Sequence, residues 1–325
     1  MSTQTALRFA QKGALKEVLS IQSIPIPSIQ QGQSLVHIYA SAINPSDVMN
    51  IEGKFAQTTL PRTPGRDFAG VVVDGPKAQQ GTRVWGTGGS NGFERDGAHA
   101  EHIVVTSDEL AQMPANLSFS QAAACGVGFL TASTMLRKSG VGKGDFVLVL
   151  GSSGAVGSSA VQLAHLQGAI PLETSRKPAS GMINITDDLP PQVKEATSGK
   201  GIAAVIDTVG DAALFKKSLE ALGPDGTYVI ISVARTPSAE FTFNAFDFYR
   251  ARKSLIGINS LPIDFATASK VLGELKQGFE DGLLKAPALL EETDLSDEKG
   301  VVEAYEKVKK GSKAKQILVN KNVEG

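Results

Sequence analysis

The sequence predicts an α/β protein in which a doubly wound parallel sheet is inserted into a second, mostly β domain. Three observations lead to this prediction. Residues 146–150 are apolar without alternation, which suits a parallel strand buried on both faces. A turn of small residues follows directly, and apolar residues at helical spacing then continue to residue 165. Later apolar runs alternate with helix-like segments, and this alternation is typical of a doubly wound sheet.

The remaining elements of the parallel sheet follow in chain order. Further strands are predicted at 202–206, 228–233 and 255–258, with a helix at 212–222. One edge of the sheet departs from the usual pattern, because only Pro178 to Gly181 separate Lys177 from the next apolar segment, 182–185. A parallel crossover requires about a dozen residues. We therefore predict that the crossover helix of the third strand is missing and that this edge is shortened.

The predicted β domain begins at the N-terminal end of the sequence. Short alternating apolar runs bounded by turn residues are typical of antiparallel strands. Such runs lie at 34–40, 69–73, 82–86 and 99–105. A helix-like segment at 119–138 then leads into the first parallel strand.

The β domain resumes after the parallel sheet. Helix patterns at 265–277 and 301–310 precede a last strand at 316–319. A sheet domain inserted between two parts of a β-rich domain is the simplest assembly of these patterns. The predicted boundaries are 1–122 and 261–325 for the β-rich domain and 123–260 for the parallel-sheet domain.

Composition excludes several functional classes. At 325 residues the chain exceeds the usual size of a single core, and its hydrophobic content of 42% is ample for two. A net charge of −1 gives no reason to expect a nucleic-acid or anionic-membrane partner. The sole cysteine, Cys125, excludes an intrachain disulfide and a multi-cysteine zinc site. The first residues lack a hydrophobic signal region, which favours a cytoplasmic location.

The turn after the first parallel strand has the composition of a dinucleotide-binding turn. Gly151, Gly154 and Gly157 recur at every third position, and the residues between them are small enough for a pyrophosphate to approach the backbone. The helix would begin at the phosphates, where free amides and the positive dipole end stabilise negative charge. Because the spacing is GxxGxxG instead of GxGxxG, a purely structural turn is the alternative. The expected cofactor contacts are Ser152, Ser153, Gly154, Ala155, Val156 and Gly157.

The end of the second parallel strand indicates which nicotinamide cofactor binds. NAD enzymes place an acid there for the ribose hydroxyls, roughly 20 residues after the glycines. If the strand ends near Thr174, then Ser175, Arg176 and Lys177 face the ribose and favour the extra phosphate of NADPH. If Glu173 turned towards the ribose instead, NAD would be preferred. We predict NADPH, with a solvated charge pair as the alternative for the two cations.

Motifs along nearly the whole chain resemble one known family. They are ASAINPSDV at 40–48, TPGRDFAGVV at 63–72, GTRVWG at 81–86, DGAHAEHIVV at 96–105, GDFVLVLGSSGAVGSSAVQLAH at 144–165 and AKQILV at 314–319. Together they are similar to the medium-chain dehydrogenase/reductase superfamily, and most to its zinc-free quinone oxidoreductase and zeta-crystallin branch. The resemblance implies a Rossmann domain inserted in a GroES-like catalytic domain.

The resemblance also bears on metal chemistry. Zinc-dependent relatives place a cysteine and a histidine at motif positions that hold Asn44 and Arg66 here, and the third ligand position falls near Val127. The four histidines show no ligand spacing, and we expect His99 and His102 on opposite sides of a strand-like segment. No metal site is therefore predicted.

Hydride addition to an activated C=C bond is well served by NADPH without a Lewis acid. The resemblance implies that Asn44 touches the nicotinamide ribose or carboxamide and that Thr131 lies beside the same ring. A tyrosine proton donor of related reductases is replaced by Phe55, which cannot donate a proton. Water, the cofactor ribose hydroxyl and a nearby side chain remain as candidate donors. The side chains considered are Lys54, His99 and Tyr249, whereas Asp47 and Asp67 are expected to orient loops or to pair with Arg66.

Further contacts complete the predicted site. Thr208 and Val209 follow one strand. The resemblance implies that Ser232, Val233 and Arg235, at the end of the next strand, face the nicotinamide and that Lys315 reaches the cofactor. An apolar, planar substrate is suggested by a set of aromatic residues, for which core packing is the alternative. They are Phe55, Trp85, Phe93, Phe129, Phe246 and Tyr249.

The predicted function is NADPH-dependent reduction of a quinone or an α,β-unsaturated carbonyl. Two alternatives remain open from the sequence: a zinc-free alcohol or ketone dehydrogenase, and a non-catalytic NADPH-binding protein. Relatives commonly dimerise by pairing the last strands of two parallel sheets, so the resemblance suggests a homodimer formed through 255–258.

Overall fold

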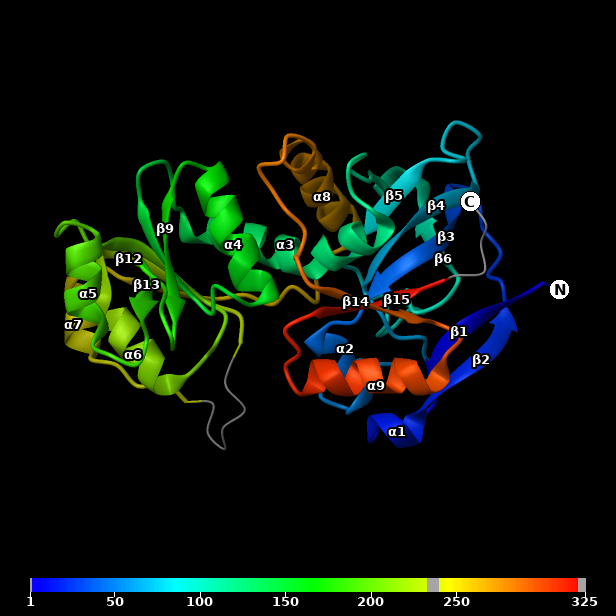
Figure 1. The fold of residues 1–325 in the computed structure, drawn as a ribbon, viewed down its shortest axis with the longest axis horizontal. Coiled ribbons are helices and arrows are strands. Elements are labelled where there is room, and N and C mark those ends of the chain that lie inside the picture. The colour runs from blue at the N-terminus through cyan, green and yellow to red at the C-terminus, as the bar shows by residue number, and fades with distance from the viewer. Residues whose placement is uncertain (1, 233–239, 321–325) are drawn as a thin grey trace. The chain divides into compact units, whose positions relative to one another are not determined.

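Two large β-sheets organise the chain (Figure 1). The computed structural model describes residues 2–232 and 240–320. Contacts divide the described residues into two units, which fall within Met1–Leu130 plus Leu261–Gly325 and within Thr131–Ser260. The division falls inside helix α3 (Phe119–Ser139), so one continuous helix belongs to both units. The sequence places the first boundary slightly earlier, at residue 122.

A mixed sheet forms the centre of the first unit, in the strand order β14-β15-β3-β4-β5-β7, with β6 also pairing β3. All its pairings are antiparallel except that of β14 with β15. The strands are β3 (Gln33–Ala42), β4 (Asp67–Asp74), β5 (Arg83–Gly86), β6 (His102–Thr106), β7 (Ala111–Gln112), β14 (Leu290–Asp294) and β15 (Lys315–Val319). A separate hairpin-like pair joins β1 (Thr3–Phe9) to β2 (Leu19–Pro25).

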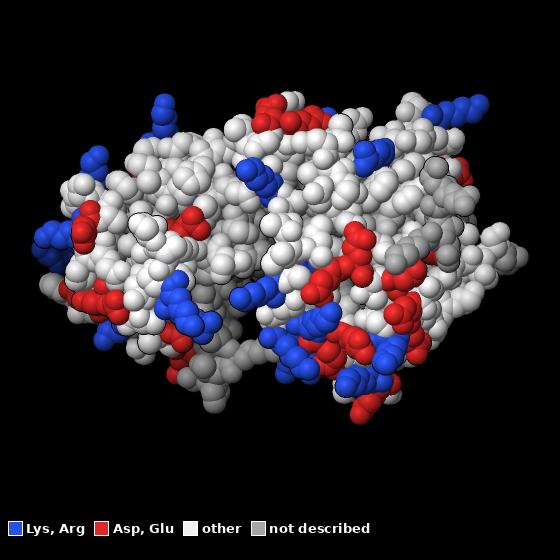
Figure 2. Space-filling model, viewed as in Figure 1, with Lys and Arg blue, Asp and Glu red and all other residues white. Residues whose placement is uncertain are grey.

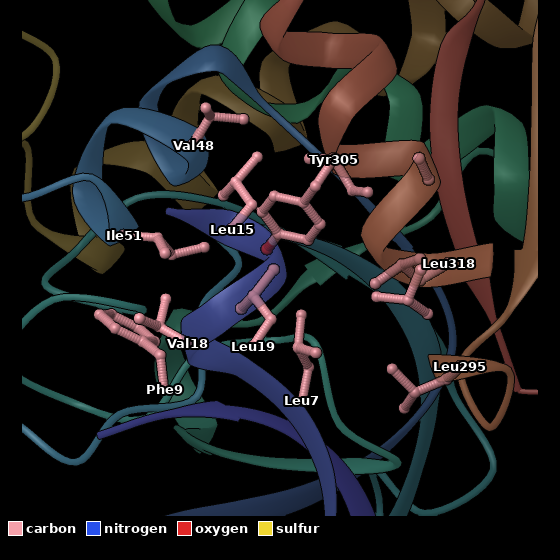
Figure 3. Packing of buried hydrophobic residues seen from close by; sticks show 13 residues of the cluster. Leu7, Phe9, Leu15, Val18, Leu19, Val48, Ile51, Leu295, Tyr305 and Leu318 are labelled. Carbon is pink, nitrogen blue, oxygen red and sulfur yellow. The ribbon is translucent and has the colours of Figure 1, made fainter. Parts of the chain in front are cut away.

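Helices close the first unit around this sheet. They are α1 (Leu15–Val18), α2 (Pro45–Ile51), α8 (Phe265–Glu280) and α9 (Glu298–Lys309), with a 3₁₀ turn at Ser107–Glu109. Figure 3 shows the core beside α9, where Tyr305 lies among apolar side chains from α1, α2 and β1. Segments from both ends of the chain therefore share one core, which includes Leu318 of β15, and β15 pairs with β3.

The second unit is a six-stranded parallel sheet with the order β10-β9-β8-β11-β12-β13. Its strands are β8 (Phe146–Leu150), β9 (Ile170–Ser175), β10 (Ile183–Asn184), β11 (Ile202–Asp207), β12 (Leu222–Ile230) and β13 (Ser254–Gly257). Its helices are α4 (Ala155–Leu166), α5 (Leu189–Ala196), α6 (Ala212–Ala221) and α7 (Ala245–Arg250). Strands β9 and β10 lie on one side of β8, and β11, β12 and β13 lie on the other. The strand order therefore reverses at β8, and nucleotides bind at the carboxyl end of the strands at such a switch point. The predicted fold class is thereby confirmed.

The shortened edge predicted from the sequence is present. Strand β10 pairs with β9 through only two residues, and 176–182 connect the two strands without a helix. The pairing is nevertheless parallel, so a short irregular link replaces the usual crossover. Strand β12 also differs from its prediction at 228–233, because it begins at Leu222 and ends at Ile230.

Helix α3 is the one described helix that is long and apolar enough to cross a membrane, and 72% of its most apolar window is buried within the protein. Small residues and buried leucines let it pack in the interior, where Ala122, Leu130 and Leu136 are each at most 1% exposed. We therefore interpret α3 as a core helix.

Candidate active site

The glycine turn joins β8 to α4 and is closely packed. Gly151 has a φ of +76°, and a Cβ at this position would lie 2.5 Å from Oγ1 of Thr208. A Cβ on Gly157 would lie 2.1 Å from the carbonyl oxygen of Gly151. Side chains are therefore excluded at both positions, one by conformation and both by space. The turn brings the first turn of α4 directly against the end of β8.

The amino end of α4 is open to a ligand. Gly154 is the N-cap and supplies no side-chain hydrogen bond to the amides that follow it. Ser153, Gly154 and Ala155 are exposed, and Val156 is partly exposed. Free first-turn amides and the helix dipole make such an end a site for phosphate.

Ser152 differs from its neighbours because it is buried and ties the turn to β9. Its hydroxyl donates to the carbonyl oxygen of Thr174 at 3.0 Å, and the Thr174 amide lies 3.2 Å from the same hydroxyl oxygen. The Thr174 hydroxyl in turn donates to the carbonyl oxygen of Val149 at 2.8 Å. These bonds place the end of β9 beside the glycine turn.

Three residues predicted to read the ribose phosphate lie where β9 ends. Ser175 is the last residue of the strand, and its hydroxyl accepts the Lys177 amide at 3.0 Å. Arg176 and Lys177 are exposed immediately beyond it. Hydrogen bonds hold Thr174 against the glycine turn, and the two cations come directly after the strand end. Arg176 and Lys177 therefore lie at the end of β9, where the ribose phosphate is expected.

The predicted contacts at the neighbouring strand ends have different surroundings. The Thr208 hydroxyl donates to the Leu150 carbonyl oxygen at 2.8 Å, so this side chain holds the glycine turn in place. The Val209 amide donates to Oδ1 of Asp207, and its side chain packs at the edge of the second unit's core. Ser232 lies two positions beyond β12 and is partly exposed. Val233 and Arg235 lie outside the described residues.

A second polar centre surrounds Asn44 in the first unit. Asn44 is the N-cap of α2, is only 3% exposed, and donates from its backbone amide to the Asp47 carboxylate at 2.8 Å. Its side-chain amide donates from Nδ2 to Oδ2 of Asp67 at 2.9 Å. Its Oδ1 accepts a hydrogen bond from the ammonium of Lys315 at 2.6 Å. The orientation of the Asn44 amide is therefore determined from both sides.

Asp67 anchors this centre at the start of β4 and is fully buried. Its Oδ1 accepts the Val127 amide at 3.0 Å, and its backbone carbonyl accepts the Ser41 hydroxyl at 2.6 Å. Helix α3 can approach this closely because residue 126 is glycine, where a Cβ would lie 2.4 Å from Oδ1 of Asp67. The carboxylate thus links α3, β4 and the start of α2.

Burial changes the protonation of the groups around Asn44. It raises the pKa of Asp47 to about 7, with the nearby Asp67 charge adding to the rise and the amide of Asn44 opposing it. Burial lowers the pKa values of Arg66 and Lys315, while Asp67 and Asp47 counteract both shifts. Two carboxyl groups and two cations therefore share one largely dehydrated centre.

Two of the side chains in this centre cannot ligate a metal. The positions that carry cysteine and histidine in zinc-dependent relatives hold the Asn44 amide and the Arg66 guanidinium, and an ammonium lies on the amide. Guanidinium and ammonium groups have no lone pair to offer a metal. Within residues 2–232 and 240–320 no group of three His, Cys, Asp or Glu side chains is arranged to hold an ion.

The proposed proton donors fall into two groups. His99 is fully buried, lies 2.6 Å from the Tyr305 hydroxyl through Nδ1 and 3.3 Å from the Ala42 carbonyl oxygen through Nε2, and burial lowers its pKa to about 4. It is therefore neutral near pH 7. Lys54 and Tyr249 are exposed. His102 begins β6, whereas His99 precedes the strand, and Nε2 of His102 lies 3.1 Å from Nδ1 of His37.

The aromatic residues predicted for the substrate pocket do not form one group. Phe55 and Phe93 pack edge to face at 5.3 Å between ring centroids. Trp85 and Phe129 are 1% exposed and both pack against Phe279, which supports the core-packing alternative for these two. Phe246 and Tyr249 lie on α7 of the second unit and are 59% and 61% exposed.

Thr131 is the first residue of the second unit and is 3% exposed. Its hydroxyl has no hydrogen-bond partner among the described residues, which is unusual for a buried polar group.

The sequence did not identify the contact of Lys315 with Asn44, the close approach at Gly126 or the Tyr305–His99 pair. A glycine in the middle of a helix pattern was the one visible signal, because such a glycine marks a close backbone approach.

Comparison with known proteins agrees with this architecture. The family described as alcohol dehydrogenase GroES-like domain matches residues 30–115, and the family described as zinc-binding dehydrogenase matches 155–274. The chain belongs to the medium-chain dehydrogenase/reductase superfamily and is an NAD(P)-dependent oxidoreductase by that membership.

Particular relatives differ in the activities that they are named for. A zinc-type alcohol dehydrogenase-like protein of Schizosaccharomyces pombe is 39% identical over 92% of both chains. A quinone oxidoreductase of Pongo abelii is 28% identical over 93% of this chain and 94% of its own. Among solved structures, one of an NAD-dependent alcohol dehydrogenase has a TM-score of 0.84 at 27% identity, covering 97% of this chain and 99% of that one.

Proposed function

We propose that this protein is an NADPH-dependent reductase of quinones or α,β-unsaturated carbonyl compounds that works without zinc. The observation that carries the proposal is the centre around Asn44, where an amide and a guanidinium stand at positions of metal ligands and an ammonium is bound to the amide oxygen. Alcohol oxidation needs a Lewis acid or a strong base to remove the hydroxyl proton. An activated C=C bond already spreads the charge that a hydride delivers, so it needs no metal.

The second unit supplies the features that a dinucleotide requires. Ser153, Gly154, Ala155 and Val156 would hold the pyrophosphate at the amino end of α4, where Gly157 permits close packing. Ser175, Arg176 and Lys177 would hold the 2′-phosphate, which supports NADPH over NADH. Bound NADPH supplies a hydride for the substrate.

The first unit would orient the reacting partner. Asn44 would contact the nicotinamide ribose or carboxamide, and Thr131 would use its unpartnered hydroxyl beside the same ring. Phe55 and Phe93 would pack against an apolar substrate. Trp85, Phe129, Phe246 and Tyr249 contribute less to this proposal, because the first two are core residues and the others lie on the surface of α7.

We also propose a cytoplasmic homodimer with no nucleic-acid or membrane partner. Strand β13 lies at the edge of the parallel sheet, and Leu255 on it is 41% exposed. An unpaired edge with exposed apolar residues is suited to pairing with a second copy. On the face shown in Figure 2, Lys and Arg side chains are interspersed with Asp and Glu. Light scattering of the purified protein tests the dimer, and a charge at Leu255 should dissociate it.

The central experiment measures NADPH and NADH oxidation by purified protein against a panel of acceptors. We expect turnover with quinones, enones or enals, with NADPH preferred, no loss after dialysis against a chelator, and no turnover with saturated ketones. Reduction of saturated ketones, or oxidation of alcohols, would replace the proposal with a dehydrogenase activity, which the names of two relatives favour. Thermal stabilisation by NADPH without turnover of any acceptor would indicate a cofactor-binding protein that is not an enzyme.

A further inference from the structure

The ammonium of Lys315 is an unusual, largely enclosed charge. Its one hydrogen bond among the described residues goes to the neutral amide oxygen of Asn44, at 2.6 Å. No carboxylate oxygen of the described residues lies within ion-pair distance of it. The Asp67 carboxylate instead accepts a hydrogen bond from the nitrogen of the same Asn44 amide. Buried lysines are normally paired with a carboxylate. Here an amide holds the cation in place without neutralising it.

The arrangement leaves part of this cation free to bind something else. An ammonium has three N–H groups, and the contact with Asn44 uses one of them. Lys315 begins β15 and is partly exposed, unlike the buried residues that follow it in the strand. The position of its ammonium is well defined, because β15 pairs with β3 and because hydrogen bonds to Asp47 and Asp67 hold Asn44.

Charges from every neighbouring element act on this ammonium. Asp47 lies on α2 and Asp67 on β4, and both favour the charged form of Lys315, which burial opposes. Cys125 faces the same centre from α3. The Cys125 thiol is neutral because burial raises its pKa, and its hydrogen is donated to the Gln121 carbonyl oxygen. The neighbouring His99 is neutral as well. Lys315 and Arg66 are therefore the two cations of the centre, and Arg66 is 1% exposed.

We propose that the Lys315 ammonium takes the electrophilic role that a metal ion has in zinc-dependent relatives, by donating a hydrogen bond to the substrate's carbonyl oxygen. This inference rests on the proposed reductase function and assigns a catalytic residue to it. When the β carbon accepts a hydride, the C=C electron pair shifts and the carbonyl oxygen becomes an enolate oxygen. A positioned N–H donor stabilises that charge more in the transition state than in the ground state. A proton from solvent at the α carbon then completes the saturated carbonyl product.

The experiment compares Lys315→Met, Lys315→Arg and the control Lys313→Ala, which removes an exposed lysine two residues away. Kinetics are measured with a series of aryl enones whose ring substituents range from electron-donating to electron-withdrawing, and NADPH binding is measured by fluorescence titration. For Lys315→Met we expect kcat to fall about 10²- to 10³-fold, as for the loss of one oxyanion donor. The Kd for NADPH should stay within about twofold, and Lys313→Ala should resemble the wild type.

A substituent series separates an electrophilic role from a structural one. Without the ammonium, the rate should depend more steeply on electron-withdrawing substituents, because the substrate alone must stabilise the charge. Lys315→Arg keeps a donor and should restore part of kcat, and it also serves if Lys315→Met does not fold. An unchanged substituent dependence, or a raised Kd for NADPH with unchanged kcat, would overturn the inference. If the wild type turns over none of these acceptors, the proposed function itself fails.

Discussion

The glycine turn of the second unit and the Asn44 centre of the first are built in opposite ways. The turn uses backbone groups and the absence of side chains within 151–157. The Asn44 centre uses side chains from α2, β4 and β15, together with an amide of α3. The glycine turn is therefore encoded by one short segment of the sequence. In the Asn44 centre, each group depends on the placement of elements that are distant in the sequence.

The largest effect is expected from removing the carboxylate that links these elements. Asp67→Ala would leave the Asn44 side-chain amide and the Val127 backbone amide without their acceptor, and would remove a negative charge that favours the charged forms of Arg66 and Lys315. Breaking a buried charged network in this way costs about 3–5 kcal/mol. Urea denaturation measures the loss, and Asp74→Ala at the exposed far end of β4 is the matched control. A loss below about 1 kcal/mol would show that the centre contributes little to folding.

A smaller and more local effect is expected in the glycine turn. A Cβ at Gly157 meets the Gly151 carbonyl oxygen at 2.1 Å, whereas a Cβ at Gly154 meets the same atom at 3.4 Å. Gly157→Ala should therefore destabilise the protein by about 1–3 kcal/mol and weaken NADPH binding, as overpacking does. Gly154→Ala should change stability little. Equal effects of the two substitutions in urea denaturation and NADPH titration would contradict the packing argument.

The next expected effect concerns cofactor choice and leaves the fold unchanged. Replacing both Arg176 and Lys177 with alanine removes two exposed cations from the end of β9. We expect the KM for NADPH to rise about 10-fold or more, as the loss of charge-assisted hydrogen bonds of about 1.5–3 kcal/mol implies, and the KM for NADH to change little. Lys194→Ala, on the exposed side of α5, is the control. An equal rise for both cofactors would argue against recognition of the 2′-phosphate.

The last effects concern pH, and two groups of the first unit should act in opposite directions. Burial lowers the pKa of His99 to about 4, below that of an unfolded histidine, so this group makes the protein less stable as pH falls from about 6.5 to 4. Burial raises the pKa of Asp47 to about 7, so this group makes the protein less stable as pH rises from about 4 to 7.

Thermal denaturation across pH 4–8 can separate these two contributions. Asp47→Asn removes the second, so its Tm relative to the wild type should rise with pH over that range. His99→Gln removes the first, so its relative Tm should rise as pH falls. Parallel curves for a variant and the wild type would mean that the substituted group does not titrate differently in the folded and unfolded states.

Much of the fold was predictable because its signals are local. The apolar run of β8, the glycines after it and the helical spacing of α4 lie within 146–166, so short-range sterics and burial determine them. The missing crossover helix was predictable from the distance between Lys177 and β10 alone. The hairpin of β1 and β2 and the short helix α7 were not predicted. The hairpin depends on the burial of β1 residues such as Leu7 and Phe9, whereas α7 is a short helix without buried residues that begins at the N-cap Asn244.

The sequence by itself determined that a parallel sheet carries a dinucleotide turn and that the positions of zinc ligands hold Asn44 and Arg66. Both follow from residue identity, since glycine alone tolerates the turn and neither an arginine nor an asparagine replaces those ligands. Only the tertiary structure decided which group the Lys315 ammonium contacts. It lies 271 positions from Asn44 along the chain, and β15 must pair with β3 before its ammonium meets the amide. No local pattern encodes a contact of that kind, because its energy depends on burial and on the charges that other elements bring to the same place.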